Sequence, residues 1–195
     1  MEIILASTNK GKIKELKKML EKYDINILSL KDINYTDEIE ENGTTFEENA
    51  IIKAKTISRY TNKIVISDDS GIEIRALNNE PGIYSARYSG LGDIENNNLV
   101  LRKMKDKTDM YAQYVAVICL YFPNGTYKTY KGICAGEITL NPRGENGFGY
   151  DPLFYLPSYN KTMAELDMDE KNKISHRSKA LHLMCEDIDL ILNYK

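Results

Sequence analysis

The chain has 195 residues, of which 42% are hydrophobic, enough to form the core of one domain or of two tightly joined lobes. A net charge of −3 argues against a protein that wraps duplex nucleic acid. The three cysteines lie far apart and the histidines number two, which disfavours a disulfide framework, a thiolate zinc site and a multi-histidine metal site.

The first part of the chain alternates between predicted strands and helices. Short apolar or alternating runs predict strands at residues 2–6, 25–30, 63–67 and 71–77. Apolar residues at helical spacing predict helices at residues 7–23, 44–60 and 94–106. The segment at 79–93 is rich in glycine and proline and is predicted to be mostly loop.

The second part of the chain is dominated by a predicted hairpin. Residues 111–140 form two strand-like runs around the turn signal Asn124-Gly125. A glycine-rich segment that becomes strand-like follows at 141–157, and 175–192 is predicted as an amphipathic helix. We therefore expect a mixed α/β fold, with residues 1–195 forming a single domain.

Neither a signal peptide nor a membrane span is predicted. The N-terminal segment "MEIILAS" turns polar after five residues, which is too short for a signal peptide. No apolar run approaches the length needed to cross a membrane. We expect a cytoplasmic protein without membrane or nucleic-acid partners.

Three cations fall on the apolar faces of predicted helices. Lys12, Lys53 and Arg177 each project beside residues that should pack into the core, and two of them lie near helix N-termini. Taken singly, each of these long side chains could extend past the core and place its charge in water. Three such cases favour a shared anion, and free N–H groups at helix N-termini suit a polyphosphate.

Two adjacent carboxylates, Asp68 and Asp69, follow the strand predicted at 63–67. Because successive strand side chains point to opposite faces, only one of them is expected to face a ligand, while the other braces the structure. Carboxylate oxygens favour magnesium, and Glu40 and Glu41 offer further oxygens unless their loop is merely solvated. The "DDSG" stretch does not supply the Asp-x-Asp nucleophile motif, and the sequence contains no P-loop and no Ser-His-Asp elbow.

Several blocks of sequence resemble the inosine/xanthosine triphosphate pyrophosphatases. The matching blocks, in order, are "LASTNKGKIKEL", "EENGTTFEENAIIKA", "SDDSG", "PGIYSARYSG", "GFGYDPLF" and "EKNKISHRSKAL". In the first block many relatives have a glycine before the asparagine, but Asn9 and Lys12 keep their spacing. The resemblance implies a mixed, elongated β-sheet with flanking helices and two lobes around a central cleft. It also implies a homodimer that hydrolyses aberrant purine nucleoside triphosphates (ITP, dITP, XTP and dXTP) to monophosphate and pyrophosphate.

The resemblance also implies which residues handle the phosphates and the metal. Asp69 would be the catalytic carboxylate that activates water or holds Mg²⁺, with Glu41 as a further metal ligand. Asp68 and Glu15 would support the site, and Ser70 would touch the substrate. The groups expected around the phosphates are Ser7, Thr8, Asn9, Lys10, Gly11, Lys12, Lys53 and Lys171.

The base would be recognised by a separate set of residues. Phe148 would stack on the purine, with Gly149, Tyr150 and Asp151 beside it. His176 and Arg177 would read the base edge, because donors suit the 6-keto oxygen of hypoxanthine or xanthine and leave the amino group of adenine unpaired.

Two other functions remain open at this point. A Maf-like pyrophosphatase would act on other modified nucleotides, but the "SHR" and "GFGYDP" blocks favour the purine family. A non-catalytic nucleotide sensor would have no need for a carboxylate that activates water.

Overall fold

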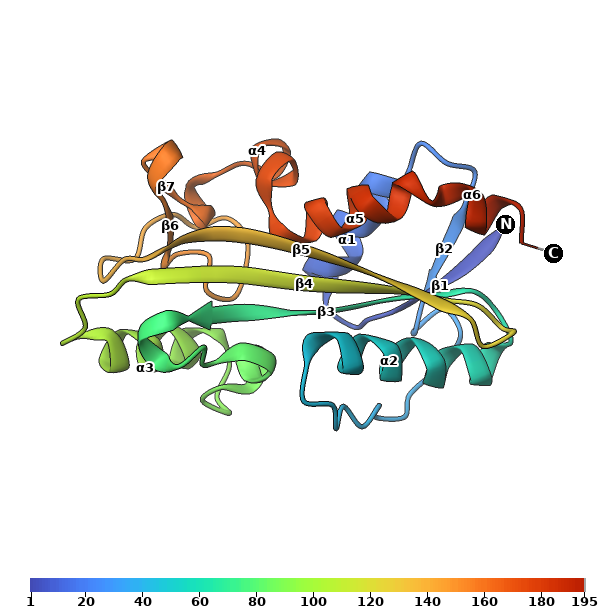
Figure 1. Ribbon diagram of the computed structural model, residues 1–195, viewed down its shortest axis with the longest axis horizontal. Coiled ribbons are helices and arrows are strands. Elements are labelled where there is room, and N and C mark those ends of the chain that lie inside the picture. Colours follow the sequence, from blue (N-terminus) through green and yellow to red (C-terminus); the bar gives the residue numbers. More distant parts are fainter. Residues whose placement is uncertain (195) are drawn as a thin grey trace. The chain divides into compact units, whose positions relative to one another are not determined.

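The computed structural model describes residues 1–194 as a mixed α/β fold (Figure 1), which confirms the predicted fold class. The strands are β1 (Glu2–Ala6), β2 (Asn26–Ser29), β3 (Val65–Ile74), β4 (Tyr111–Tyr121), β5 (Tyr127–Ile138), β6 (Phe154–Leu156) and β7 (Lys161–Thr162). The α-helices are α1 (Lys10–Leu20), α2 (Phe46–Thr61), α3 (Asp93–Met104), α4 (Met168–Ile174), α5 (His176–Glu186) and α6 (Ile188–Leu192). Short 3-10 helices occupy Arg75–Leu77, Gly82–Arg87, Pro157–Tyr159 and Met163–Glu165.

The strands hydrogen-bond in the order β2-β1-β3-β4-β5-β6-β7. Strand β1 is parallel to both of its neighbours, with Ile4 opposite Leu28 of β2 and Val65 of β3. Strands β5, β6 and β7 are antiparallel. The predicted hairpin between β4 and β5 is confirmed, and Gly125 adopts the positive φ of 89° that its turn requires.

The chain divides into two compact units, and β3, β4 and β5 contribute residues to both. The first unit contains residues 1–69, 116–132 and the chain from Arg177 onward. Within it, α2 lies on one face of the strands and α1 and α5 lie on the other (Figure 1). Its core includes Ile3, Leu16, Ile66, Ile118 and Leu181.

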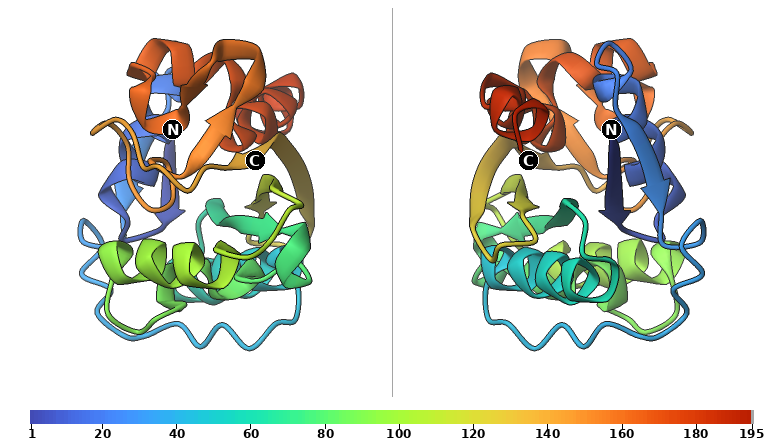
Figure 2. Two further views of the ribbon diagram at one scale, coloured as in Figure 1. Left: turned by 90° about the vertical axis from the view of Figure 1, so that its left-hand side faces the viewer. Right: turned by 90° about the vertical axis from the view of Figure 1, so that its right-hand side faces the viewer.

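The second unit contains residues 70–115 and 133–176. Helix α3 lies on one side of its strands and α4 lies on the other, and Figure 2 shows the same arrangement from the two ends. The core of this unit is lined by Ile72, Val100, Tyr114, Phe154 and Met163. Each unit therefore has its own apolar core, built from segments that are distant in sequence.

The prediction that one strand ends at residue 67 and another begins at residue 71 is wrong. Strand β3 runs without interruption from Val65 to Ile74 and carries both adjacent aspartates. The two side chains point to opposite faces of the strand, and each carboxylate is paired with a cation.

Helix ends differ from the prediction where a side chain caps the backbone. Helix α1 begins at Lys10 because Asn9 Oδ1 accepts hydrogen bonds from the backbone N–H groups of Gly11 and Lys12. Helix α2 begins at Phe46, after the Thr45 side chain accepts a hydrogen bond from Glu48 N. The helix predicted at 175–192 is broken at Asp187 into α5 and α6.

Helix α4 was missing from the prediction, although the sequence carries its signal. Asp167 and Glu170 form a reciprocal capping box, in which each side chain accepts a hydrogen bond from the backbone of the other. Within residues 1–194, no helix is long and apolar enough to cross a membrane.

Candidate active site

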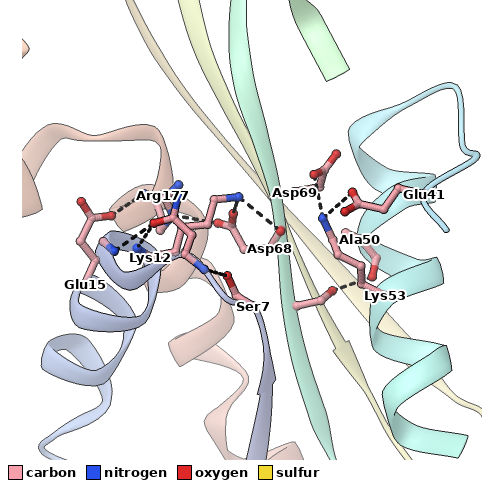
Figure 3. Close-up of polar contacts among 12 residues, drawn as sticks. Ser7, Lys12, Glu15, Glu41, Ala50, Lys53, Asp68, Asp69 and Arg177 are labelled. Atoms are coloured by element: carbon pink, nitrogen blue, oxygen red, sulfur yellow. Dashed lines mark hydrogen bonds and ion pairs between the residues drawn. The ribbon is translucent and has the colours of Figure 1, made fainter. Parts of the chain in front are cut away.

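The side chains of Asp68 and Asp69 point to opposite sides of β3 (Figure 3). This confirms the expectation that adjacent strand residues cannot serve the same point. Asp68 faces α1 and Arg177, whereas Asp69 faces α2 (Figure 3). The two carboxylates therefore have separate environments, although they share one stretch of backbone.

Asp68 is held by two cations and is 3% exposed. Lys12 Nζ lies 2.5 Å from Oδ1, and Arg177 Nε donates to Oδ2 at 2.8 Å. Burial alone would raise the pKa of Asp68, but Arg177 and Lys12 outweigh it and hold the pKa well below its usual range. Asp68 is therefore ionised at neutral pH, and its two ion pairs brace the site.

Arg177 connects Asp68 to helix α1. Its Nη1 group donates to the carboxylate of Glu15, which is 4% exposed, while its Nε group donates to Asp68. Of the three cations expected to share an anion, Lys12 and Arg177 meet at Asp68. Lys53 pairs with Glu41 and Asp69 on the other side of β3 (Figure 3). The expectation that Arg177 also donates a hydrogen bond to the purine base stays a prediction.

Asp69 shares the ammonium group of Lys53 with Glu41. Lys53 Nζ donates at 2.8 Å to Asp69 Oδ1 and at 2.8 Å to Glu41 Oε2. Burial opposes the positive charge of Lys53, but the two carboxylates outweigh it and raise its pKa. Burial raises the pKa of Asp69 above its usual value, although Lys53 and Lys12 oppose this shift.

The carboxylate oxygens of Asp69 and Glu41 are ligands of the type that Mg²⁺ prefers. Asp69 Oδ2 is buried and has no hydrogen-bond partner among residues 1–194, so one carboxylate oxygen remains available to a ligand. Within the same residues, no group of three or more acidic, histidine or cysteine side chains forms a metal cluster. Asp69 and Glu41 would hold Mg²⁺ only together with water or phosphate oxygens, as is common for this ion.

The loop before α1 presents backbone and side-chain donors. Ser7 is half-buried, Thr8 and Lys10 are exposed, and Asn9 caps the helix. Lys12 in the first turn is largely buried, and burial lowers its pKa while Asp68 opposes the shift. The helix N-terminus and Lys12 together form a positively polarised end that suits phosphate.

The second unit contains a cluster around the buried carboxylate of Asp151. Lys171 Nζ donates to Asp151 Oδ2 at 2.8 Å and lies 4.8 Å from the centre of the Phe148 ring. Asp151 also accepts hydrogen bonds from Phe148 N at 3.0 Å and from the Tyr114 hydroxyl at 3.2 Å. These contacts set the position of Phe148 and fix its backbone.

Gly147 is required beside Phe148 for a steric reason. A Cβ atom at this position would lie 2.0 Å from Asp151 Oδ2, and the backbone has a φ of 82°. Gly149 is held on both sides by α3, because Asp93 Oδ2 accepts from its N–H and Asn97 Nδ2 donates to its carbonyl. Asp93 and Asn97 were missed in the sequence, although their spacing of four places them on one face of α3.

His176 stacks on Tyr114, with ring centres 4.6 Å apart and planes 11° apart. It is 5% exposed, so the ring is held in a defined orientation. Tyr114 has a pKa raised well above its usual value by burial and by Asp151. Tyr150 is buried and its hydroxyl donates to Ser85 O at 2.7 Å, while Ser70 lies half-buried on β3 directly after Asp69.

The predicted site residues therefore fall into two clusters, one in each unit. The first combines the loop before α1 and Lys12 with Glu15, Glu41, Lys53, Asp68, Asp69 and Arg177, while Ser70, the next residue of β3, begins the second unit. The second combines Phe148, Gly149, Tyr150, Asp151, Lys171 and His176. The first cluster offers cations and a carboxylate, and the second offers an aromatic ring with fixed polar neighbours.

The fold and the first cluster define a class of mixed α/β protein in which buried carboxylates and cations flank one strand. The chain belongs to the Ham1 family, whose model matches residues 3–187. It is 48% identical to a dITP/XTP pyrophosphatase of Bacillus licheniformis, over 96% of this chain and 98% of that protein. It is 45% identical to the dITP/XTP pyrophosphatase of Staphylococcus epidermidis, with 96% of each chain covered.

Solved structures of Ham1 proteins have the same fold. The Ham1 protein of Staphylococcus aureus matches with a TM-score of 0.89 and 44% identity, over 97% of this chain and 98% of that one. A HAM1 protein from Coxiella burnetii also matches with a TM-score of 0.89, at 42% identity, over 96% and 98% of the two chains.

Proposed function

We propose that the protein is a nucleoside triphosphate pyrophosphohydrolase that converts aberrant purine triphosphates (ITP, dITP, XTP and dXTP) to monophosphate and pyrophosphate. The observation that carries this proposal is the difference between the environments of the two adjacent aspartates. Asp68 is locked between Lys12 and Arg177, whereas Asp69 keeps one buried oxygen without a hydrogen-bond partner among residues 1–194. The printed names of relatives 45–48% identical over nearly the whole chain support the same activity.

Asp69 is the group assigned to the reacting water. Burial raises the pKa of Asp69, which makes this carboxylate a stronger proton acceptor than one in free solution. Water attacks the α-phosphorus, its proton passes to Asp69, and the bond from the α-phosphorus to the bridging oxygen breaks. Pyrophosphate leaves with the electron pair of that bond, and Lys12 and Lys53 offset the negative charge.

Mg²⁺ is the proposed cofactor, with Glu41 and Asp69 as its protein ligands. The ion would neutralise phosphate charge and polarise the phosphorus–oxygen bonds. Lys53 now bridges the same two carboxylates, so it would shift toward the phosphates when the metal binds. The donor set, which contains only oxygen, suits Mg²⁺ and disfavours softer metals.

The base is assigned to Phe148 and its neighbours. The half-buried Phe148 ring, whose backbone N–H donates to Asp151, is the proposed stacking partner of the purine, and the His176 ring is held flat against Tyr114. A hydrogen-bond donor placed to meet the 6-keto oxygen would face the amino group of adenine instead and would lack an acceptor. This would cost about 1–3 kcal/mol and would disfavour adenine. We further propose that the protein is cytoplasmic and forms a homodimer. Light scattering of the purified chain would test the dimer, and fractionation of cells would test the location.

The decisive experiment is hydrolysis of dITP, XTP, dATP and dUTP in ¹⁸O-labelled water with Mg²⁺. The proposal expects pyrophosphate as the product, ¹⁸O in the nucleoside monophosphate, and a strong preference for dITP and XTP. Orthophosphate with a nucleoside diphosphate would refute the assigned bond cleavage. A preference for a modified pyrimidine would favour the Maf-like alternative, and binding without turnover would identify a sensor.

A further inference from the structure

A buried asparagine adjoins the loop that carries Glu41. Asn49 lies in the N-terminal part of α2 and is 1% exposed. Its Oδ1 accepts a hydrogen bond from Gly43 N at 2.9 Å, while its Nδ2 is buried without a hydrogen-bond partner among residues 1–194. Burying an amide donor without a partner is unfavourable, so the residue calls for an explanation beyond general stability.

The backbone at Gly43 packs closely against the start of α2. A Cβ atom added to Gly43 would lie 2.6 Å from Asn49 Oδ1 and 2.7 Å from Glu48 Cβ. Thr44 is held as well, because its backbone N–H and its hydroxyl both donate to the Glu48 carboxylate, at 2.6 and 2.8 Å. The first turns of α2 therefore fix the backbone of residues 43 and 44.

This fixed segment begins two residues after Glu41. The Glu41 carboxylate reaches Lys53 Nζ at 2.8 Å, and the same ammonium contacts Asp69 at 2.8 Å (Figure 3). Asn49 and Lys53 are four residues apart and so lie on one face of α2, one turn from each other. One turn holds the loop that carries Glu41, and the next turn receives its carboxylate.

We propose that Asn49 is a positioning residue for Glu41, and that its hydrogen bond to the Gly43 backbone keeps the Glu41 carboxylate beside Asp69 for metal binding. The inference rests on the proposed function, in which Glu41 and Asp69 hold Mg²⁺. Glu41 lies in a loop, so its carboxylate would sample other positions without this anchor. Partners that orient metal ligands typically change metal affinity or activity by about 10- to 100-fold when they are removed.

The test compares Asn49→Ala with Asn96→Ala in the full chain. Asn96 is a matched control because it is also 1% exposed and also accepts a backbone hydrogen bond through Oδ1, from Ser89 N at 2.7 Å. Both variants should melt at lower temperature than the wild type. Only Asn49→Ala should weaken Mn²⁺ binding, measured by electron paramagnetic resonance, and raise the half-saturating Mg²⁺ concentration for dITP hydrolysis, each by about 10-fold or more.

A double-mutant cycle identifies the route of the effect. Adding Asn49→Ala to a Glu41→Gln background should cause no further loss of Mn²⁺ affinity, because the ligand that Asn49 positions is already impaired. Gly43→Ala perturbs the same contact from the loop side and should reproduce the weaker Mn²⁺ binding. It also serves as the test if Asn49→Ala does not fold.

Two results would overturn the inference. The first is Mn²⁺ binding by Asn49→Ala, or by Gly43→Ala where it replaces that variant, equal to that of Asn96→Ala. The second is a full additional loss in the double variant with Glu41→Gln. Failure of the wild type to release pyrophosphate from dITP would refute the proposed function instead, and the Mn²⁺ measurements would still decide the role of Asn49.

Discussion

Replacement of Arg177 by alanine should remove a brace from the centre of the first unit. The side chain is 2% exposed, and its guanidinium donates to Asp68 and Glu15, which are themselves buried. After the substitution, Glu15 loses this charged partner, and Asp68 keeps its ion pair with Lys12. Buried carboxylates deprived of a cation strongly destabilise the folded state.

The expected loss of unfolding free energy is about 3–5 kcal/mol, the range measured when one member of a buried ion pair is removed. For a chain of this length, such a loss lowers the melting temperature by about 6–20 °C. Arg75→Ala is the matched control, since Arg75 makes a two-bond ion pair with Asp109, at 2.6 and 2.8 Å, but its side chain is 62% exposed. It should melt close to the wild type because exposed ion pairs contribute little.

Kinetics on the same Arg177→Ala protein separate bracing from base recognition. If Arg177 acts by holding Asp68, kcat/KM should fall by the same factor for ITP and ATP. If it donates to the 6-keto oxygen, ITP alone should lose about 1–3 kcal/mol of transition-state binding. A melting curve like that of Arg75→Ala, together with a selective loss for ITP, would refute the bracing argument.

The remaining predictions concern the two aspartates and the metal. Asp69→Asn should lower pyrophosphate release by about 10²- to 10⁴-fold while the melting temperature changes little, and near-normal turnover would show that Asp69 is structural. Because the folded-state pKa of Asp68 is depressed, its stabilising contribution is complete above about pH 4 and is lost as the pH falls toward that pKa. Urea unfolding of the wild type and Asp68→Asn should therefore show a stability difference that narrows below about pH 4, and a difference that widens there would contradict the assignment. Chelation with EDTA should abolish turnover, Mg²⁺ should restore it and Mn²⁺ should restore it in part, whereas unchanged turnover would exclude the metal.

The regular elements were predictable wherever local signals decide the structure. The hairpin follows from the Asn124-Gly125 turn and from the strand-like runs on either side of it. The missed helix α4 also had a local signal, the spacing of Asp167 and Glu170. These features depend on residues within a few positions of each other.

The continuity of β3 was not predictable in the same way. The strand passes through Asp68 and Asp69 because Lys12, Lys53 and Arg177 compensate their charges. These cations come from three helices, and Arg177 lies 109 residues from Asp68 along the chain. The sequence showed that the cations fall on apolar helix faces, but it did not show which carboxylate each would meet.

The adjacency of Asp68 and Asp69 can now be explained by the geometry of a strand. Two carboxylates on the same face would repel each other and share one titration. On opposite faces, Asp68 meets two cations and its pKa falls, whereas burial dominates at Asp69 and its pKa rises. Carboxyl groups whose pKa values are pushed apart can take different roles, one as a fixed charge and the other as a base. The same backbone that Asp68 fastens to α1 and α5 therefore holds Asp69 in place, so the bracing by Asp68 and the catalytic role proposed for Asp69 are coupled through one peptide bond.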